Sequence, residues 1–288
     1  MLYDLGILWE WKYDEKFVRL VDAFCQRSGK TSYLVWPRNF NESMTRILSG
    51  ELRFRVVLDR ATDSDPAFIP IVRLHQEAQS KIINVPEKAI HTHNRALMHL
   101  EFMSGGVNVP YTLMLSPNET VDEKAMEVIG HPFVIKPVEG EGGGEGVFLG
   151  AQTVDEVERV RKQYPGKQIL IQENIIPREF NQRRCWFRVF YTCGKVIPCF
   201  WDDLTHIYRR LAPEEEMVFS DLKRITEKIQ KIIGLEFFST EIVQTGEGKF
   251  VVVDYVNDQC DMRFQSDTPD GVPDSVVGEI AKAIVETI

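Results

Sequence analysis

Two acidic residues interrupt apolar, strand-forming segments near the end of the chain. Glu241 lies within the segment 237–243 and Asp254 ends the segment 250–254, and Phe, Val and Ile dominate both. Ionised carboxylates on such strands cost free energy unless positive charge compensates them. With the nearby amide of Asn257, the two acids offer the oxygen ligands that magnesium prefers, and phosphate oxygens and water would complete its octahedron. Because side chains alternate along a strand, the two acids share a face only if the hairpin register permits it.

A glycine-rich segment points to a nucleotide phosphate as ligand. Lys136 ends a predicted strand at 133–136, and residues 140–146 that follow contain five glycines in seven positions. Such a segment lets backbone N–H groups approach phosphate oxygens without intervening side chains. The spacing fits neither the Rossmann fingerprint nor the P-loop, because Glu145 stands where the first requires glycine and no Gly-Lys-Ser/Thr sequence follows.

The surrounding sequence predicts an α/β and α+β protein in three parts. Strand-like and helix-like segments alternate over residues 1–90, which indicates a small doubly wound α/β lobe. Residues 91–168 read as an α+β subdomain that carries the glycine-rich segment. Residues 169–288 combine several strands with a helix at 219–233 and a last helix at 275–287, and they carry the two acids.

Composition limits the class of partner. The 288 residues include 34 Lys and Arg against 43 Asp and Glu, a net charge of -9, which argues against broad nucleic-acid or anionic-membrane binding. The start of the chain lacks the pattern of a secretory signal, and no apolar run is long enough for a membrane span. Five cysteines, an odd number without a Cys-x-x-Cys motif, indicate reduced thiols. We therefore expect a cytoplasmic protein.

Together these motifs resemble the ATP-grasp superfamily over roughly residues 90–288, and the α/β lobe resembles the pre-ATP-grasp domain. The likeness rests on Lys136 before the glycine-rich segment, on the hinge-like sequence 171–179, and on two acids separated by 254 − 241 = 13 positions. Within the superfamily, the chain is most similar to carboxylate-amine and carboxylate-thiol ligases of the ribosomal-protein-S6 glutamate ligase and glutathione synthetase type.

The resemblance implies specific site residues. Those implied to bind ATP are Arg95, Lys136, Gly142, Gly143, Gly144, Gln172, Glu173, Asn174, Ile175 and Glu179. Glu173 and the backbone up to Ile175 would hold adenine, and Glu179 the ribose hydroxyls. Glu241, Asp254 and Asn257 are the implied metal ligands. Asp258 is an alternative third ligand, because the family places its asparagine two positions after the acid and Asn257 lies three after Asp254.

The implied activity is an ATP- and magnesium- or manganese-dependent ligation through an acyl phosphate, which releases ADP and phosphate. Arg188 would stabilise the transferring phosphoryl group and Arg263 would lie at the acyl-substrate end. The partners would be small-molecule or peptide carboxylates and amines, and the protein would form a homodimer. Two alternatives remain open: a small-molecule kinase on the same scaffold, and a nucleotide-binding protein without turnover. Arginine at position 95, where the family has lysine, suggests the second.

Overall fold

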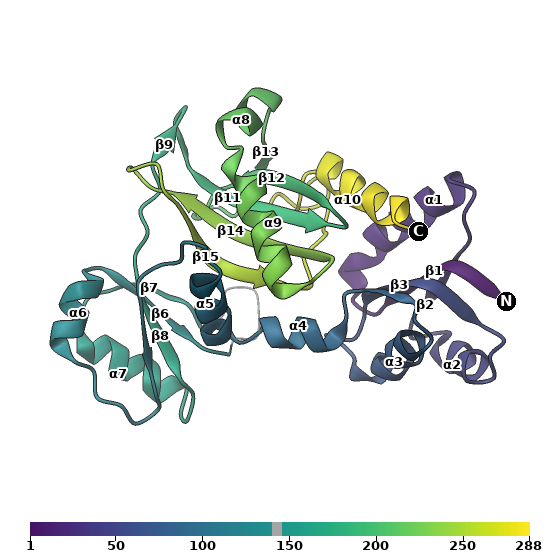
Figure 1. Cartoon of the computed structure of the whole chain (residues 1–288), viewed down its shortest axis with the longest axis horizontal. Coiled ribbons are helices and arrows are strands. Elements are labelled where there is room, and N and C mark those ends of the chain that lie inside the picture. The colour runs from purple at the N-terminus through teal and green to yellow at the C-terminus, as the bar shows by residue number, and fades with distance from the viewer. Residues whose placement is uncertain (140–145) are drawn as a thin grey trace.

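The computed structural model describes residues 1–139 and 146–288, and most of its strands belong to three sheets, each in its own lobe (Figure 1). The N-terminal sheet is parallel, with strand order β2-β1-β3-β4. Its strands are β1 (Leu2–Trp9), β2 (Ser32–Val35), β3 (Arg53–Arg60) and β4 (Lys81–Ile83), and its helices are α1 (Glu15–Arg27), α2 (Phe40–Leu48) and α3 (Ile69–Glu77). This is the α/β lobe that the alternating sequence pattern predicts.

The middle sheet is antiparallel, with strand order β5-β8-β6-β7. It consists of β5 (Thr112–Leu115), β6 (Phe133–Pro137), β7 (Phe148–Ala151) and β8 (Ile169–Glu173), accompanied by α6 (Glu123–Ile129) and α7 (Val154–Gln163). Strand β8 pairs with β5 and β6, although the sequence analysis assigned it to the third part of the chain. We therefore propose that the boundary expected at residue 168 lies after Glu173.

The large sheet is also antiparallel, with strand order β13-β12-β11-β14-β15. Its strands are β11 (Trp186–Thr192), β12 (Lys195–Trp201), β13 (Tyr208–Arg210), β14 (Phe237–Gln244) and β15 (Phe250–Asn257). Helix α9 (Asp221–Ile233) packs on β11 and β12, and it ends at Gly234 in the left-handed conformation, with φ 67°. The helix α10 (Asp274–Glu286) contacts both β11 and α1.

Several short elements lacked a clear sequence signal. They are α4 (Pro86–Thr92), α8 (Pro213–Val218), and the two-stranded pair β9 (Glu179–Phe180) and β10 (Arg183–Arg184). Helix α5 (Arg95–Ser104), by contrast, follows the amphipathic pattern of its sequence and packs against α9 and β15. It therefore lies where the middle and large sheets approach each other (Figure 1).

The N-terminal sheet and the large sheet share one hydrophobic core. Leu5 and Ile7 of β1 belong to the same buried cluster as Phe190 of β11 and Ile280 of α10. A buried ion pair of the N-terminal lobe lies at this junction: Arg60 Nη2 is 2.6 Å from Asp14 Oδ2, and it reaches across to donate to the carbonyl oxygen of Cys260 at 2.8 Å. The two side chains are only 3% and 1% exposed, so the pair is shielded from water.

We expect Arg60→Met to lower the free energy of unfolding by about 3–5 kcal/mol, because it leaves the carboxylate of Asp14 buried without a counter-charge. Denaturant unfolding measures this loss. Arg19→Met is the matched control, since Arg19 pairs with Glu15 on the exposed side of α1 and should cost less than about 1 kcal/mol. Equal losses in the two variants would contradict the prediction.

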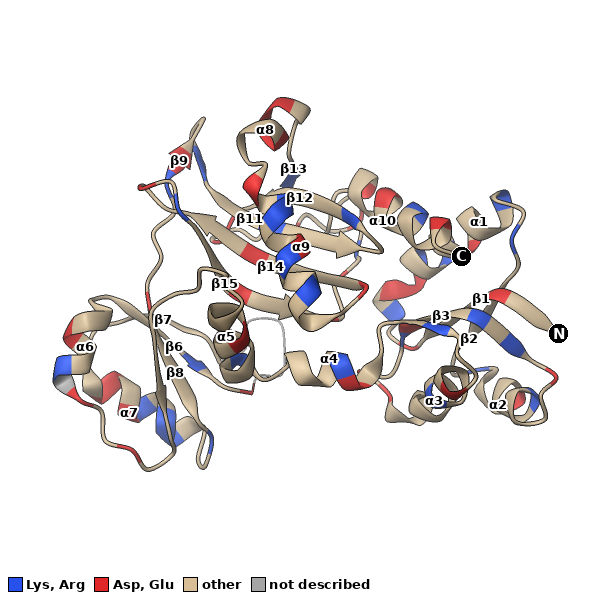
Figure 2. Ribbon diagram, viewed as in Figure 1, with Lys and Arg blue, Asp and Glu red and all other residues tan. Residues whose placement is uncertain are grey.

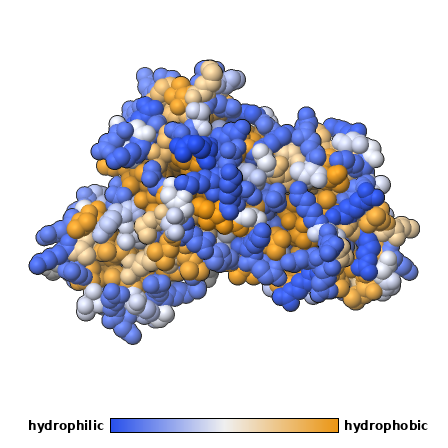
Figure 3. All heavy atoms as spheres, viewed as in Figure 1, coloured by the Kyte–Doolittle hydropathy of each residue, from blue (hydrophilic) through white to orange (hydrophobic). Residues whose placement is uncertain are grey.

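Charged residues of both signs are interspersed over the helices of all three lobes (Figure 2). On the face drawn in Figure 3, hydrophilic atoms surround hydrophobic patches in each lobe. Within the described residues, no helix is long and apolar enough to cross a lipid bilayer. The chain thus presents a mixed surface, in keeping with its composition.

Candidate functional site

Three charged residues form a row across neighbouring strands of the large sheet. Arg188 of β11 is the register partner of Glu241 of β14, and Glu241 is the register partner of Asp254 of β15. Arg188 Nη1 lies 2.8 Å from Glu241 Oε1, and its Nε donates to Ser239 Oγ at 3.2 Å. The hairpin register therefore satisfies the condition that the sequence left open, and both acids lie side by side.

An irregularity in β15 brings Asn257 to the same place. Three residues of β14, Ser239 to Glu241, oppose four residues of β15, Asp254 to Asn257. In a regular strand, residues three positions apart lie on opposite faces. The bulge places Asn257 on the same face as Asp254. Asn257 Nδ2 donates to Asp254 Oδ2 at 2.6 Å. Asp258, in contrast, accepts from Asn84 Nδ2 at 2.6 Å, at the end of the N-terminal sheet.

The electrostatics of the row favour a bound cation. Burial raises the pKa of Glu241 to about 7; the positive charge of Arg188 opposes this shift, and the negative charge of Asp254 adds to it. Two carboxylates and an amide oxygen form a hard-oxygen donor set suited to Mg²⁺. Among residues 1–139 and 146–288, no group of three or more His, Cys, Asp or Glu is placed to hold a metal. A cation here would therefore depend on Asn257 and on oxygen atoms of a substrate.

Lys136 reaches the row from the middle sheet, and Arg95 of α5 lies near Lys136. Lys136 Nζ, on β6, donates to the carbonyl oxygen of Val253 at 2.8 Å, next to Asp254. Arg95 Nη1 donates to the carbonyl oxygen of Pro137 at 2.9 Å. Burial lowers the pKa of Lys136; Asp254 opposes that shift and the like charge of Arg95 adds to it. Gly142, Gly143 and Gly144, which the sequence analysis assigned to phosphate, lie outside the described residues.

Two polar side chains of the hinge-like sequence 171–179 form hydrogen bonds within the protein. Gln172 is buried and its Nε2 donates to Tyr255 Oη at 2.7 Å, whereas Glu173 Oε1 accepts the backbone N–H of Tyr111 at 2.8 Å. Asn174 is exposed and Ile175 packs on the valine cluster of β14 and β15. The Glu173 carboxylate, expected at adenine, is thus held by the backbone of the chain. The backbone from Glu173 to Ile175 and the side chain of Asn174 are the better candidates for contact with a ligand.

Glu179 and Arg263 lie apart from the row. Glu179 is exposed on β9 and pairs in register with Arg184 of β10. Arg263 follows β15, and its guanidinium lies 2.7 Å from Asp261 and 3.0 Å from Asp270. Its two acidic partners hold Arg263 in the loop between β15 and α10, so the structure gives it no contact with Arg188.

Sequence reasoning missed two tryptophans beside the row. Trp186 Nε1 donates to Glu241 Oε2 at 3.1 Å, and the Arg188 guanidinium lies 5.7 Å from the ring centre of Trp201. Trp186 stands two positions before Arg188 on the same strand, and residues with this spacing share a face. Strand alternation could therefore have predicted that Trp186 lies beside Arg188. The contact with Trp201 could not be predicted in this way, because it depends on strand pairing.

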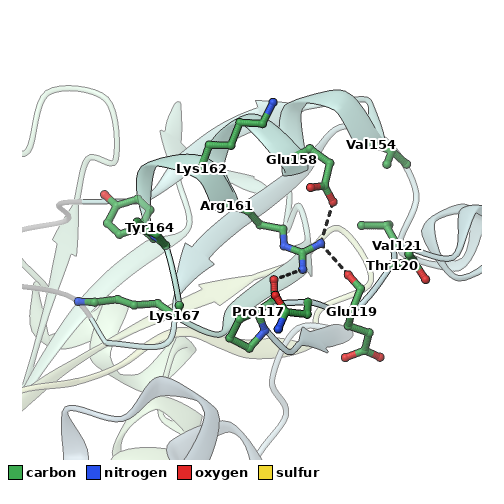
Figure 4. Close-up of a pocket in the computed structure, with 13 residues that line it drawn as sticks. Pro117, Glu119, Thr120, Val121, Val154, Glu158, Arg161, Lys162, Tyr164 and Lys167 are labelled. Atoms are coloured by element: carbon green, nitrogen blue, oxygen red, sulfur yellow. Dashed lines mark hydrogen bonds and ion pairs between the residues drawn. The ribbon is translucent and has the colours of Figure 1, made fainter.

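A surface hollow of about 640 Å³ lies elsewhere, between α7 and the turn that precedes α6 (Figure 4). Arg161 points into it and donates to Glu158 Oε1 at 2.7 Å and to the carbonyl oxygen of Glu119 at 2.6 Å. None of the residues that line the hollow belongs to the row or to its neighbours. The acids, the cations and the hinge converge at the large sheet rather than at this hollow.

Comparisons with known proteins bear on the fold. No family model matches the chain. A crystal structure of a RimK domain protein ATP-grasp from Sphaerobacter thermophilus is similar over 98% of both chains, with a TM-score of 0.65 and 18% identity. D-alanine--D-alanine ligase from Bacillus anthracis complexed with ATP has a TM-score of 0.65 and 12% identity, and covers 99% of this chain and 97% of its own.

Two further relatives carry informative descriptions. The ATP-grasp ligase PsnB, complexed with minimal precursor, Mg and ADP, has a TM-score of 0.66 and 14% identity, over 98% of this chain and 97% of its own. A probable alpha-L-glutamate ligase of Thioalkalivibrio sulfidiphilus is 27% identical over 155 residues, or 51% of this chain. The chain matches about half the length of that relative, 50%.

Proposed function

Because the chain has the ATP-grasp fold, we propose that it is an ATP- and Mg²⁺-dependent ligase that joins a carboxylate to an amine or thiol. The reaction would pass through an acyl phosphate and release ADP and phosphate. The observation that carries this proposal is the row Arg188–Glu241–Asp254, with Asn257 on one side and Lys136 reaching it from the middle sheet.

In this proposal, Glu241, Asp254 and Asn257 hold the magnesium, which supplies positive charge for the nucleotide phosphates. Lys136 and Arg95 bind phosphate oxygens from the opposite side. Arg188 is fixed by Ser239 and Glu241, so its guanidinium is oriented before the substrate arrives. Such preorganised charge stabilises the transferring phosphoryl group more than it stabilises the bound substrate.

The remaining assignments concern the nucleotide and the second substrate. The backbone from Glu173 to Ile175 would contact adenine, and Glu179 the ribose. Backbone N–H groups of Gly142, Gly143 and Gly144 would cover the phosphates and exclude water, which otherwise hydrolyses an acyl phosphate. Arg263 would act at the acyl end, and for this it would have to exchange at least one of its two acidic partners.

The test is ADP release in the presence of ATP and Mg²⁺ with both a carboxylate and an amine. L-glutamate and glutamate-ending peptides are the first probes, because one relative is a probable alpha-L-glutamate ligase. We expect ADP release to require both partners. With ¹⁸O in the carboxylate, one labelled oxygen should appear in the released phosphate, because acyl-phosphate breakdown leaves that atom on phosphorus.

If ADP forms in the presence of the probes but no amide or thioester product accompanies it, the proposed ligase activity is contradicted. A stable phosphorylated product with no ¹⁸O in free phosphate would identify a kinase instead. Tight ATP binding with no ADP formed would identify a nucleotide-binding protein without turnover.

A further inference from the structure

Four polar side chains form a buried network where the middle sheet, the large sheet and α5 meet. They are His99 of α5, Thr112 of β5, Gln172 of β8 and Tyr255 of β15. Gln172 is 1% exposed, and His99 and Tyr255 are each 4% exposed. Tyr255 Oη lies 2.8 Å from His99 Nδ1 and 2.7 Å from Gln172 Nε2, and Gln172 Nε2 lies 3.0 Å from Thr112 Oγ1.

The protons of this network can be assigned from its donors and acceptors. Gln172 Nε2 carries two protons, and it donates one to Tyr255 and one to Thr112. With the Tyr255 hydroxyl as donor to His99 Nδ1, every one of these contacts is satisfied by a neutral His99 that carries its proton on Nε2. Burial also lowers the pKa of His99, which favours this neutral form. Thr112 donates onward to the carbonyl oxygen of Pro110 at 2.8 Å.

Two members of the network lie next in sequence to residues of the proposed site. Gln172 precedes Glu173, where the adenine hinge begins, and Tyr255 follows Asp254, a proposed metal ligand. The network side chains are therefore attached to the same stretches of backbone as these two site residues.

The other two members reach the site through a helix and through a backbone contact. His99 lies four positions after Arg95 on α5, so the two residues share one face of the helix. Thr112 follows Tyr111, whose N–H holds the Glu173 carboxylate at 2.8 Å. The network thus joins the three elements to which the proposed function assigns phosphate, adenine and metal contacts.

We propose that His99, Thr112, Gln172 and Tyr255 are positioning residues that align the adenine hinge with the metal-binding acids. This inference rests on the proposed function. The hydroxyl of Tyr255 is the central atom, because it joins the strand that carries Asp254 to the strand that carries Glu173. Without it, Gln172 and His99 each lose a buried partner, and the two sheets lose one of the hydrogen bonds that join them.

The test compares Tyr255→Phe with Tyr191→Phe. Tyr191 lies on β11 in the same hydrophobic cluster as Tyr255 and is 8% exposed, but it is outside the network. Calorimetric titration measures the Kd of ADP with Mg²⁺ and again with a chelator. In the wild type, Mg²⁺ should strengthen ADP binding, because one nucleotide then contacts both the hinge and the acids. We expect Tyr255→Phe to reduce this strengthening about tenfold, and Tyr191→Phe to preserve it.

A merely structural role would lower the unfolding midpoint of Tyr255→Phe without changing the ratio of the two Kd values, and that result would overturn the inference. If Tyr255→Phe fails to fold, Thr112→Val and Thr112→Ser supply the same comparison. Valine should reduce the effect of Mg²⁺, serine should retain it, and equal behaviour would contradict the network. Absence of any Mg²⁺ effect on ADP binding in the wild type would overturn the proposed function and this inference with it.

Discussion

Glu241→Gln is expected to lower kcat for ADP release at least about 100-fold, the loss typical of removing one preorganised electrostatic group from an active site. Glu241 lies between Arg188 and Asp254 in the row, and glutamine keeps its shape but removes its charge. The variant should still fold, because the amide oxygen can accept from Arg188 or Trp186. A steady-state assay with ATP, Mg²⁺ and the active substrate pair measures the effect.

The matched control is Glu247→Gln, in the turn between the same two strands. Glu247 is exposed and pairs with Lys249 at the surface, so its loss should leave kcat unchanged. ADP with Mg²⁺ should also raise the unfolding midpoint of the wild type and of Glu247→Gln, because a ligand that binds only the folded state stabilises it. A Glu241→Gln variant with near-normal turnover would rule out Glu241 as a metal ligand.

Arg188→Met is expected to lower kcat about 100- to 1000-fold while the Kd of ADP with Mg²⁺ changes only a few-fold. Arg188 belongs to a partly buried ion pair and lies beside the proposed phosphoryl position rather than among the proposed nucleotide contacts. An interaction made chiefly in the transition state lowers kcat when it is removed, with little effect on ground-state binding.

Arg188→Lys provides the graded comparison. Lysine keeps the positive charge but cannot bond both Ser239 and Glu241 as the guanidinium fork does, so its turnover should fall between those of wild type and methionine variant. Equal losses in kcat/KM and in nucleotide affinity for Arg188→Met would instead assign Arg188 to substrate binding.

Much of the fold could be predicted because its signals are local. Alternating strands and helices identified the N-terminal lobe, and the patterns at 219–233 and 275–287 identified α9 and α10. The α/β and α+β class is confirmed by the three sheets and by the solved ATP-grasp structures that cover nearly the whole chain. Short elements such as α8 and β13 were missed, because a few residues contain too little periodicity to be recognised.

The site was predicted less completely. Glu241, Asp254 and Lys136 could be predicted as site residues because charged side chains are rarely buried on apolar strands without a partner. The sequence could not show that the Glu173 carboxylate binds the Tyr111 N–H, since the two residues lie 62 positions apart. Nor could it choose between Asn257 and Asp258, because regular strand alternation turns Asn257 away from Asp254.

The sequence by itself determined the order of the elements and the chemical types at the row: two acids and an arginine on strands, and a lysine before a glycine-rich segment. The tertiary structure decided which of these side chains meet. The bulge in β15 turns Asn257 toward Asp254, and the pairing of His99 with Tyr255 joins residues 156 positions apart. Residue type and periodicity are properties of neighbouring positions, whereas register and buried hydrogen bonds depend on contacts between distant segments, which only the packed chain specifies.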